Sequence, residues 1–301
     1  MSEPLTFVGI VTVLYNSDEV LSDFFSSLAK QNGLRLRLYV IDNGSTDSGS
    51  ILARSLATEH HVDAVVIFNN ANVGVARGNN QGIELALADG CTHVLLANND
   101  TAFGPGTIGL LLDATSSGEL VATPKIMYFD EPELIWYGGG RIDSLTMRTP
   151  HFGMMKPDKG QLDHQTHVGY APTCFMMIAS SVFERVGLMD ESFFVYYDDT
   201  DFVWRLARNQ IRIRYVPHAV VMHKVSTSTG GAHSPFTVYY ANRNRIYFIR
   251  KNLRGMRAAI ALAYVLLTRV PSALLLQRRV AARLWSGIRD GFRMAVTPNE
   301  R

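Results

Sequence analysis

Three carboxylates lie within four positions of one another in the stretch Phe193–Arg205, between aromatic and apolar neighbours. They belong to Asp198, Asp199 and Asp201. Because like charges repel and burial penalises the ionised form, such a cluster is usually held by a cation or kept for a chemical task. The alternative is a carboxylate-rich start of a helix, with Asp198 or Asp199 as N-cap and the other charges favouring the helix dipole. The stretch by itself leaves both interpretations open.

A further carboxylate, Asp100, follows Asn98 and Asn99 at the end of an apolar run that has the pattern of a buried strand. There it would project into a cleft, where it can hold Mg²⁺ or Mn²⁺ together with the oxygens of a diphosphate. An Asx turn that closes the strand is the alternative. His223 ends the short apolar run Ala219–Met222 and could give the same cation a nitrogen ligand, or merely be satisfied by hydrogen bonds.

Polar residues also follow other expected strands. Asp42, with Asn43 and Gly44 behind it, could accept hydrogen bonds from a base N–H or a ribose hydroxyl, or cap the next helix. A second polar cluster opens a helix and could grip ribose or phosphate through backbone N–H groups and an arginine, or be loop and cap chemistry only. It consists of Asn72, Gly74, Arg77, Asn79 and Asn80.

Alternating strands and helices position these side chains. Strands are predicted at Phe7–Leu14, Leu36–Ile41, Ala64–Phe68 and His93–Ala97, and helices at Asp18–Lys30, after a cap at Ser45 or Thr46, and at Ala76–Ala88. This alternation predicts an α/β fold with a doubly wound, mostly parallel sheet and right-handed crossovers. Ligands of such sheets bind beyond the carboxyl ends of the strands, so we expect the polar segments to share one rim.

The pattern loosens after Asp100. The glycine-rich stretch from Gly138 to Asp163 is predicted to be a mobile or hairpin-containing insertion. Strands are expected at Val168–Ser180 and Ile211–Val216, and a helix from Asp201 to Arg208.

The composition indicates an enzyme-like globular chain. With 301 residues it can form one large α/β domain or two small ones. A hydrophobic content of 47% and a charged content of 19% exclude a disordered protein. Cys91 and Cys174 lack metal-binding spacing and are expected to be buried thiols in a reducing compartment. The first residues have no basic n-region, so we expect no signal peptide.

The charge is divided unevenly. Residues 234–301 carry a net charge of +11 and residues 1–233 a net charge of −9. We therefore predict a catalytic domain at 1–233 and a separate segment of basic amphipathic helices at 234–301. Arg269 and Pro271 interrupt its apolar run, so we favour helices that lie on an anionic leaflet over a transmembrane helix. Packing on the catalytic domain or on a second subunit is the alternative.

Taken in order, these motifs resemble those of inverting family 2 glycosyltransferases with a GT-A fold, particularly bacterial rhamnosyltransferase-like members. The resemblance runs from Val8 to about Thr229. Its motifs are Thr12–Asn16, Val40–Asp47, Asn72–Asn80, Asn98–Thr101, and Met189–Phe194 leading into Asp198–Asp201. Five ordered motifs at compatible spacings make the resemblance specific.

The resemblance implies roles for individual residues. Thr12 and Asp42 would contact the pyrimidine nucleoside, and Asp100 and His223 would bind Mg²⁺ or Mn²⁺ on the donor diphosphate. Asp199 would be the general base that takes the proton of the acceptor hydroxyl. The full donor-binding set that we predict is Thr12, Tyr15, Asn16, Asp42, Asn43, Asn72, Gly74, Arg77, Asn80, Asn98 and Asn99.

Two positions depart from the family pattern. The usual Asp-x-Asp triplet is Asn98-Asn99-Asp100, which leaves one carboxylate, a form that is frequent in the rhamnosyltransferase-like branch. The usual Glu-Asp pair is Asp198-Asp199, so the division of roles between these two catalytic candidates stays open.

The expected reaction is a metal-assisted single displacement with inversion, from dTDP-L-rhamnose or a UDP-linked sugar to a lipid-linked or surface-polysaccharide acceptor. A sugar-nucleotide pyrophosphorylase and an inactive binding module are the alternatives, but Val11–Val20 lacks the glycine-rich phosphate loop of the former. We expect a cytoplasmic protein, peripheral on the inner face of the membrane, with no nucleic-acid partner and with homo-oligomers left open.

Overall fold

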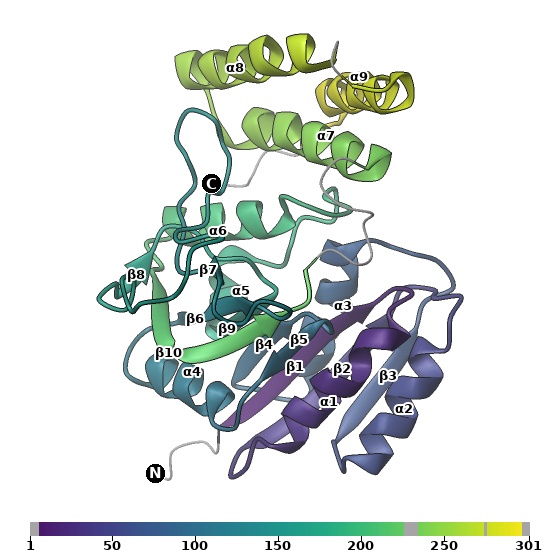
Figure 1. Ribbon diagram of the computed structural model, residues 1–301, viewed down its shortest axis with the longest axis vertical. Helices are drawn as coiled ribbons and strands as arrows, with labels where there is room; N and C mark the ends of the chain where they lie inside the picture. Colours follow the sequence, from purple (N-terminus) through teal and green to yellow (C-terminus); the bar gives the residue numbers. More distant parts are fainter. Residues whose placement is uncertain (1–5, 226–233, 274–275, 297–301) are drawn as a thin grey trace.

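The computed structural model describes residues 6–225, 234–273 and 276–296, arranged around one ten-stranded sheet (Figure 1). The strands are β1 (Phe7–Leu14), β2 (Arg35–Asp42), β3 (Ala64–Phe68), β4 (His93–Ala97), β5 (Thr101–Phe103), β6 (Val121–Tyr128), β7 (Ile135–Tyr137), β8 (His167–Val168), β9 (Phe175–Ala179) and β10 (Ile213–His223). The helices are α1 (Leu21–Ala29), α2 (Gly49–Glu59), α3 (Val75–Ala88), α4 (Thr107–Ser116), α5 (Ser181–Val186), α6 (Asp198–Arg208), α7 (Pro235–Asn252), α8 (Gly255–Ala273) and α9 (Arg278–Arg293).

The sheet has the order β3-β2-β1-β4-β9-β6-β10-β5, with β7 beside β6 and β8 beside β10. The first four strands of this order are parallel, as the βα alternation predicts. The second half is mixed, because β9 inserts antiparallel between β4 and β6 while β10 runs parallel to β6. The predicted α/β class is confirmed, and the parallel pairing is concentrated in the N-terminal half.

Close contact between α3 and β1 explains two glycines of α3. A Cβ on Gly82 would lie 2.3 Å from the side chain of Val11, and one on Gly78 would lie 3.0 Å from Val13. The helix can therefore approach the strand only with hydrogen at these positions. This packing holds the start of α3 against the carboxyl end of β1, where the predicted donor residues lie.

Several predicted bounds differ from the structure for local reasons. The helix expected after Ser45 begins at Gly49, because the backbone N–H of Ser45 donates to Asp42 (2.8 Å) and the N–H of Gly49 donates to Asp47 (3.0 Å). The helix expected from Asp18 begins with a 3₁₀ turn, Asp18–Val20, before α1. The predicted strand over residues 168–180 divides into β8 and β9.

The strand β10 joins two segments that the sequence separated. Ile211–Val216 and Ala219–Met222 were expected as two strands, with Pro217 between them, but β10 runs through both. The pairing of β10 with β6 shifts between Val216 and Val220. Proline is tolerated at such a bulge because its missing N–H is not needed in the ladder. The insertion after β7 contains one antiparallel bridge, Gly140 to His151, in keeping with a hairpin.

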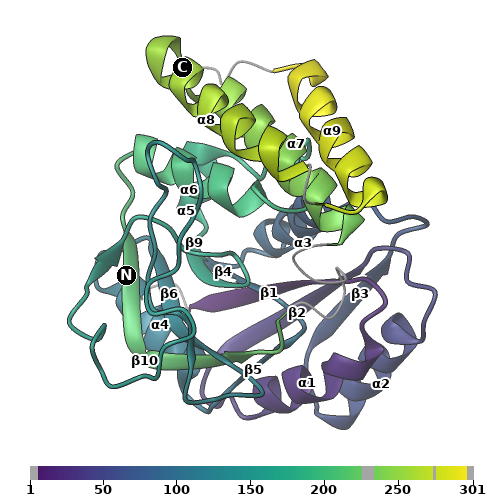
Figure 2. The same cartoon turned by 45° about the horizontal axis from the view of Figure 1, so that its top comes forward.

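The C-terminal helices lie at one end of the molecule, above α6 (Figures 1 and 2). A second hydrophobic cluster joins α7, α8 and α9 to Phe193, Tyr197 and Trp204 of the catalytic part. Helix α9 packs closely on α7, since a Cβ on Gly287 would lie 2.5 Å from a backbone oxygen of α7. Residues 234–296 are therefore built onto the catalytic part through α7.

A buried ion network fixes α7 to the start of α6. The ammonium of Lys251 lies 2.8 Å from both Asp190 and Asp201, and the side chains of Lys251 and Asp201 are 4% and 0% exposed. Arg205 completes the charge balance, 3.0 Å from Asp201. Asp201 thus anchors two helices to each other.

The described helices include none that is long and apolar enough to cross a membrane. Packing on the catalytic part, the alternative to a membrane surface, is what the structure shows for α7, while contact with an anionic leaflet stays a prediction. The predicted domain boundary at residue 233, and the end of the resemblance near Thr229, lie outside the described residues. Cys91 and Cys174 are free and buried, as expected.

Candidate active site

Asp198 and Asp199 form the first turn of α6, and neither is the N-cap. That position belongs to Tyr197, which, like Tyr196 before it, has a positive φ (67° and 64°). Consecutive bulky residues in the left-handed region are strained and persist only where the surroundings hold them. Asn244 of α7 supplies that support, since its amide nitrogen donates to the carbonyls of Val195 (2.7 Å) and Tyr196 (2.9 Å).

The carboxylate of Asp199 receives hydrogen bonds from two neighbours. The hydroxyl of Tyr170 donates to Oδ2. The backbone N–H and the hydroxyl of Thr200 donate to Oδ1, at 2.6 and 3.1 Å. Donors of this kind stabilise the ionised form of a carboxylate. Asp199 is therefore arranged to act as an anion although it is enclosed by the protein.

The two neighbouring acids differ in their protonation. Burial raises the pKa of Asp199, and the hydrogen bonds from Tyr170 and Thr200 oppose that rise. Burial and the charge of Asp199 raise the pKa of Asp198 to about 8. Close carboxyl groups that share a low-dielectric site do not readily ionise together, and the donors on Asp199 favour it as the ionised member of the pair. Of the two acids between which the sequence left the catalytic roles open, Asp199 is therefore the one suited to act as the base.

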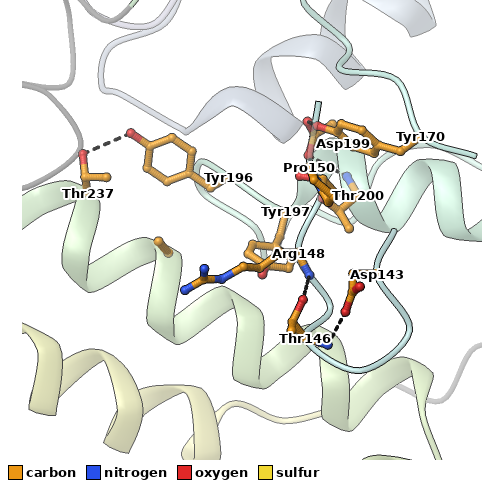
Figure 3. A pocket seen from close by; sticks show the side chains of 12 residues that line it. Asp143, Thr146, Arg148, Pro150, Tyr170, Tyr196, Tyr197, Asp199, Thr200 and Thr237 are labelled. Atoms are coloured by element: carbon orange, nitrogen blue, oxygen red, sulfur yellow. Dashed lines mark hydrogen bonds between the residues drawn. The ribbon is translucent and has the colours of Figure 1, made fainter. Parts of the chain in front are cut away.

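Asp199 lies in the wall of a cavity of about 620 Å³ (Figure 3). This volume is within the range of small-ligand sites, about 300–1,000 Å³. The wall is made by the insertion, the start of α6 and the start of α7, and its residues are Asp143, Thr146, Arg148, Thr149, Pro150, Tyr170, Tyr196, Tyr197, Asp199, Thr200, Thr237 and Ala241. Asp199 thus faces a cavity that the insertion and the start of α7, which are far apart in the sequence, close off.

Asp100 and His223 meet because β5 and β10 are antiparallel neighbours, with His223 opposite Thr101. Nε2 of His223 lies 3.2 Å from Oδ1 of Asp100. Burial raises the pKa of Asp100, but the charge and close contact of His223, with the charge of Lys224, together hold this pKa below its ordinary value. The pair therefore brings an anionic oxygen and an imidazole together at the carboxyl end of β4.

The Asp100–His223 pair fits a divalent cation. Oδ1 of Asp100, the atom that faces Nε2 of His223, is buried and accepts no hydrogen bond from the described residues. Three or more His, Cys, Asp or Glu side chains do not gather as a metal site anywhere in the described ranges. Mg²⁺ and Mn²⁺ commonly take few protein ligands and complete their shell with water and phosphate oxygens, so two ligands suit a diphosphate-bound ion.

A row of rings connects the acid pair with this candidate metal pair. The ring of His151 stacks on Tyr170 at a centroid distance of 5.8 Å and meets Trp136 at 4.6 Å. Trp136 in turn meets His223 at 4.7 Å. Burial lowers the pKa of His151 to about 4, so this histidine is neutral at physiological pH. The two chemical groups therefore belong to one packed site.

Thr12 lies near the carboxyl end of β1 and Asp42 ends the neighbouring parallel strand β2, where the register sets Thr12 beside Val40 and Leu14 beside Asp42. They are 1% and 0% exposed. Oγ1 of Thr12 and Oδ2 of Asp42 are buried without a hydrogen-bond partner among the described residues. Buried polar atoms are normally paired, so two orphaned oxygens at the predicted nucleoside position suit a ligand that forms hydrogen bonds with them.

Other predicted donor residues shape the loops. Asn16 accepts a hydrogen bond from the N–H of Thr46 (2.8 Å), and Asn43 donates to the carbonyl of Gly74 (2.9 Å). Asn72 accepts from the N–H of Gly74 (3.0 Å). A Cβ on Gly74, whose φ is 88°, would lie 2.6 Å from a backbone oxygen, so only glycine fits. These contacts hold three strand ends together.

The remaining predicted donor residues have varied surroundings. Asn80 uses its side-chain amide on Met189 and Glu191, 2.9 to 3.0 Å away, so its contacts are structural. Asn99 donates to Ser17 (2.6 Å). The exposed ones are Tyr15, Arg77 and Asn98. No ligand contact of any of these residues is tested, and their donor roles stay predictions.

The sequence did not point to several residues that build this site. Tyr170, Arg148 and Asn244 lie outside the motifs. Tyr170 donates to Asp199, Arg148 lines the same cavity, and Asn244 holds the turn before the acids. The aromatic residues and arginines of the insertion and of α7 form no sequence pattern that would single out these three positions. Only the folded contacts identify them.

Comparisons with known proteins add to this geometry. The model of "Glycosyl transferase family 2" matches residues 9–187. The "N-acetylglucosaminyl-diphospho-decaprenol L-rhamnosyltransferase" of Mycobacterium tuberculosis (strain ATCC 25618 / H37Rv) is 28% identical, over 92% of this chain and 97% of its own length. The "dTDP-rhamnosyl transferase RfbF" of Shigella flexneri is 26% identical, over 80% and 79%.

A solved structure shares the fold. It is the mannosyltransferase PcManGT from Pyrobaculum calidifontis, in complex with GDP-Man and Mn²⁺, with a TM-score of 0.61 and 14% identity, over 97% of this chain and 91% of that one.

Proposed function

The chain belongs to glycosyl transferase family 2, and from this premise we propose that it moves L-rhamnose from dTDP-rhamnose to a hydroxyl of a lipid-linked or cell-surface glycan, with inversion. The observation that carries this proposal is the carboxylate of Asp199. It is enclosed, hydrogen-bonded by Tyr170 and Thr200, and open to a cavity of about 620 Å³. Membership of the family makes the chain a glycosyltransferase, which favours a transferase over a pyrophosphorylase.

Asp199 is the proposed general base. An acceptor hydroxyl is a weak nucleophile near neutral pH, so its proton must be taken as the oxygen attacks the anomeric carbon. Tyr170 and Thr200 keep Asp199 ionised, and burial makes it a stronger base than an exposed aspartate. Asp198, protonated at neutral pH, adds no second charge beside it. A single base gives one displacement and an inverted product.

Asp100 and His223 would hold Mg²⁺ or Mn²⁺ on the donor diphosphate. When bound, such an ion acts as a Lewis acid that offsets the charge of the departing nucleoside diphosphate. Asp100 stays ionised over the physiological range, since its pKa lies below the ordinary value. Asp42 would accept the N–H of the nucleotide base through its unpartnered oxygen, and the unpartnered hydroxyl of Thr12 would donate to a carbonyl of the base.

Rhamnose and the dTDP carrier are supported by relatives. The printed names of two of them specify rhamnosyl transfer, one from dTDP-rhamnose and one to a diphospho-decaprenol-linked N-acetylglucosamine. A UDP-linked sugar remains the alternative donor. We place the protein in the cytoplasm at the inner face of the membrane, with support from exposed apolar side chains on α8 and α9, among them Met256, Leu267 and Trp285. Homo-oligomers and the expectation of no nucleic-acid partner stay untested.

Product analysis with a donor panel tests the proposal. The acceptor is N-acetylglucosamine diphosphate carrying a short alkyl chain, and the donors are dTDP-rhamnose, UDP-N-acetylglucosamine and GDP-mannose with Mn²⁺. We expect the highest kcat/KM with dTDP-rhamnose and an anomeric configuration opposite to that of the donor. A retained configuration would exclude single displacement, and a preference for a UDP-sugar would reassign the donor.

The variant Asp199→Asn tests the base in the same assay. Loss of general-base catalysis lowers rates by about 10²–10⁴-fold, so kcat should fall in this range while binding of dTDP stays unchanged. Asp113→Asn, which removes the charge of an exposed carboxylate of α4 that does not line the cavity, is the control. Turnover near wild type in Asp199→Asn would move the base to another carboxylate.

A further inference from the structure

A cluster of arginines stands at the cavity that Asp199 lines. Arg148 lines the cavity and extends from the insertion along α7 (Figure 3). Arg245 of α7 donates to the carbonyl of Thr146, another wall residue, and so lies directly behind that wall. Arg269 of α8 contributes a third positive charge to the group, since its charge acts on Arg245.

The cluster is unusual because it sets a buried arginine, Arg245, near the exposed Arg148. Arg245 is only 3% exposed. Burial lowers the pKa of Arg245, and the charges of Arg148 and Arg269 lower it further. Its Nε and Nη1 atoms are buried with no hydrogen-bond partner among the described residues. Arginine is rarely buried without an anion, so this arrangement indicates a missing negative partner.

Protein carboxylates do not fill that place. Within the described ranges, neither Arg148 nor Arg245 takes part in an ion pair. Asp143 lines the same cavity, but its Oδ1 accepts the backbone N–H groups of Leu145 (3.2 Å) and Thr146 (2.7 Å). The carboxylate of Asp143 is therefore hydrogen-bonded within its own turn and forms no ion pair with Arg148.

Because Asp199 and Arg148 line one cavity, a single ligand can contact both. We infer that Arg148, with Arg245 behind it, forms an anion subsite that binds the phosphate groups of a phosphorylated, lipid-linked acceptor while the acceptor sugar faces Asp199. Guanidinium groups suit phosphate because their fork of N–H donors matches its oxygens. The inference rests on the proposed function, since it treats the cavity as the acceptor site.

The inference also assigns a task to the C-terminal helices. Arg245 belongs to α7, so the subsite is incomplete without that helix. The basic segment would then recognise the acceptor's own phosphates.

Two acceptors that differ only in charge test the subsite. They are N-acetylglucosamine diphosphate with a short alkyl chain and the neutral alkyl glycoside of N-acetylglucosamine. In Arg148→Gln the KM for the diphosphate acceptor should rise about tenfold or more, as for a lost charge-assisted hydrogen bond, with kcat little changed. The KM for the neutral glycoside should stay constant. Arg141→Gln, an exposed arginine of the same insertion that does not line the cavity, should match wild type with both acceptors.

A binding measurement without catalysis keeps the test independent of folding problems at buried Arg245. The alkyl diphosphate acceptor is titrated calorimetrically in EDTA without donor. Wild type should bind it more tightly than the neutral glycoside, and Arg148→Gln should lose that preference, with Arg245→Gln intermediate if it folds. Equal losses for both acceptors, or no loss for either, would overturn the subsite.

Other outcomes separate the possible sources of phosphate. Inorganic phosphate should compete with the diphosphate acceptor in wild type and not in Arg148→Gln. If Arg148→Gln instead loses binding to phosphatidylglycerol vesicles with no change in acceptor KM, the cluster is a membrane contact and the inference is wrong. If wild type transfers rhamnose to both acceptors equally, the subsite fails while the proposed function stands; if it transfers to neither and binds no dTDP, the proposed function fails.

Discussion

The hydroxyl of Tyr170 donates a hydrogen bond to Oδ2 of Asp199, and the same ring stacks on His151. This contact joins the insertion to the first turn of α6. It also distinguishes Asp199 from Asp198, because the pKa of Asp199 is lowered by this donor while burial raises it. The environment that a distant tyrosine provides thus decides which of two adjacent acids is ionised.

Tyr170→Phe should shift the acid side of the pH–rate profile. Removing the donor raises the pKa of Asp199 further, so a smaller fraction is ionised at low pH and the acid limb of kcat/KM moves to higher pH. On that limb the loss should be about tenfold or more, the effect of a hydrogen bond to a charged group. Tyr137→Phe, which loses a hydroxyl bonded to the Tyr170 carbonyl (2.7 Å), is the control and should keep the wild-type limb. An unshifted limb in Tyr170→Phe would assign the limb to another group.

Asp198→Asn should stabilise the fold at neutral pH. The folded-state pKa of Asp198, about 8, lies above that of an unfolded aspartate, so folding must keep a proton on it. The resulting penalty is absent below about pH 4, grows as the pH rises and is complete above pH 8. A neutral asparagine avoids it, and the gain at pH 7 is on the order of 2–4 kcal/mol. Urea unfolding at pH 4, 6 and 8 measures the trend, and a gain that is the same at all three would show that Asp198 does not titrate this way.

Asp100→Ala and His223→Ala should weaken Mn²⁺-dependent donor binding. The loss is expected on the order of 10–100-fold, larger for Asp100, which supplies the charge, as is typical of altered metal sites. Titration of dTDP with Mn²⁺ or with EDTA measures it. Asp113→Asn, an exposed carboxylate of α4, is the control. Binding that is the same with Mn²⁺ and with EDTA in wild type would remove the metal from the reaction.

Asn244→Ala should lower kcat without changing donor affinity. The asparagine holds the strained turn at Tyr196 and Tyr197, and a displacement of the acids by about 1 Å can cost up to about 10²-fold in rate. Asn242→Ala loses only a hydrogen bond within α7 (to Val238, 2.7 Å) and should keep most activity. Thermal unfolding of both variants reports any general loss of stability. Equal kcat values in the two variants would mean that the turn needs no such support.

The bounds of β1 and β4 could be predicted from the sequence because a buried strand is a continuous apolar run, a local property. The ends of β2 and β4 then placed Asp42 and Asp100 at one rim, because parallel strands end on the same side. Bounds that depend on side-chain hydrogen bonds, such as the late start of α2 at Gly49, were missed, since Asp47 acts on the loop only in its folded conformation.

Tertiary structure alone decided how the candidate residues work. His223 meets Asp100 through the register of β5 and β10, and Asp201 is neutralised by Lys251, 50 positions along the chain. The identity of the ionised acid depends on burial and on Tyr170. The sequence by itself determined which residue types stand at the strand ends and at the start of α6. The charge that each one carries depends on which distant segments exclude water and supply hydrogen bonds, and that is a property of the folded chain.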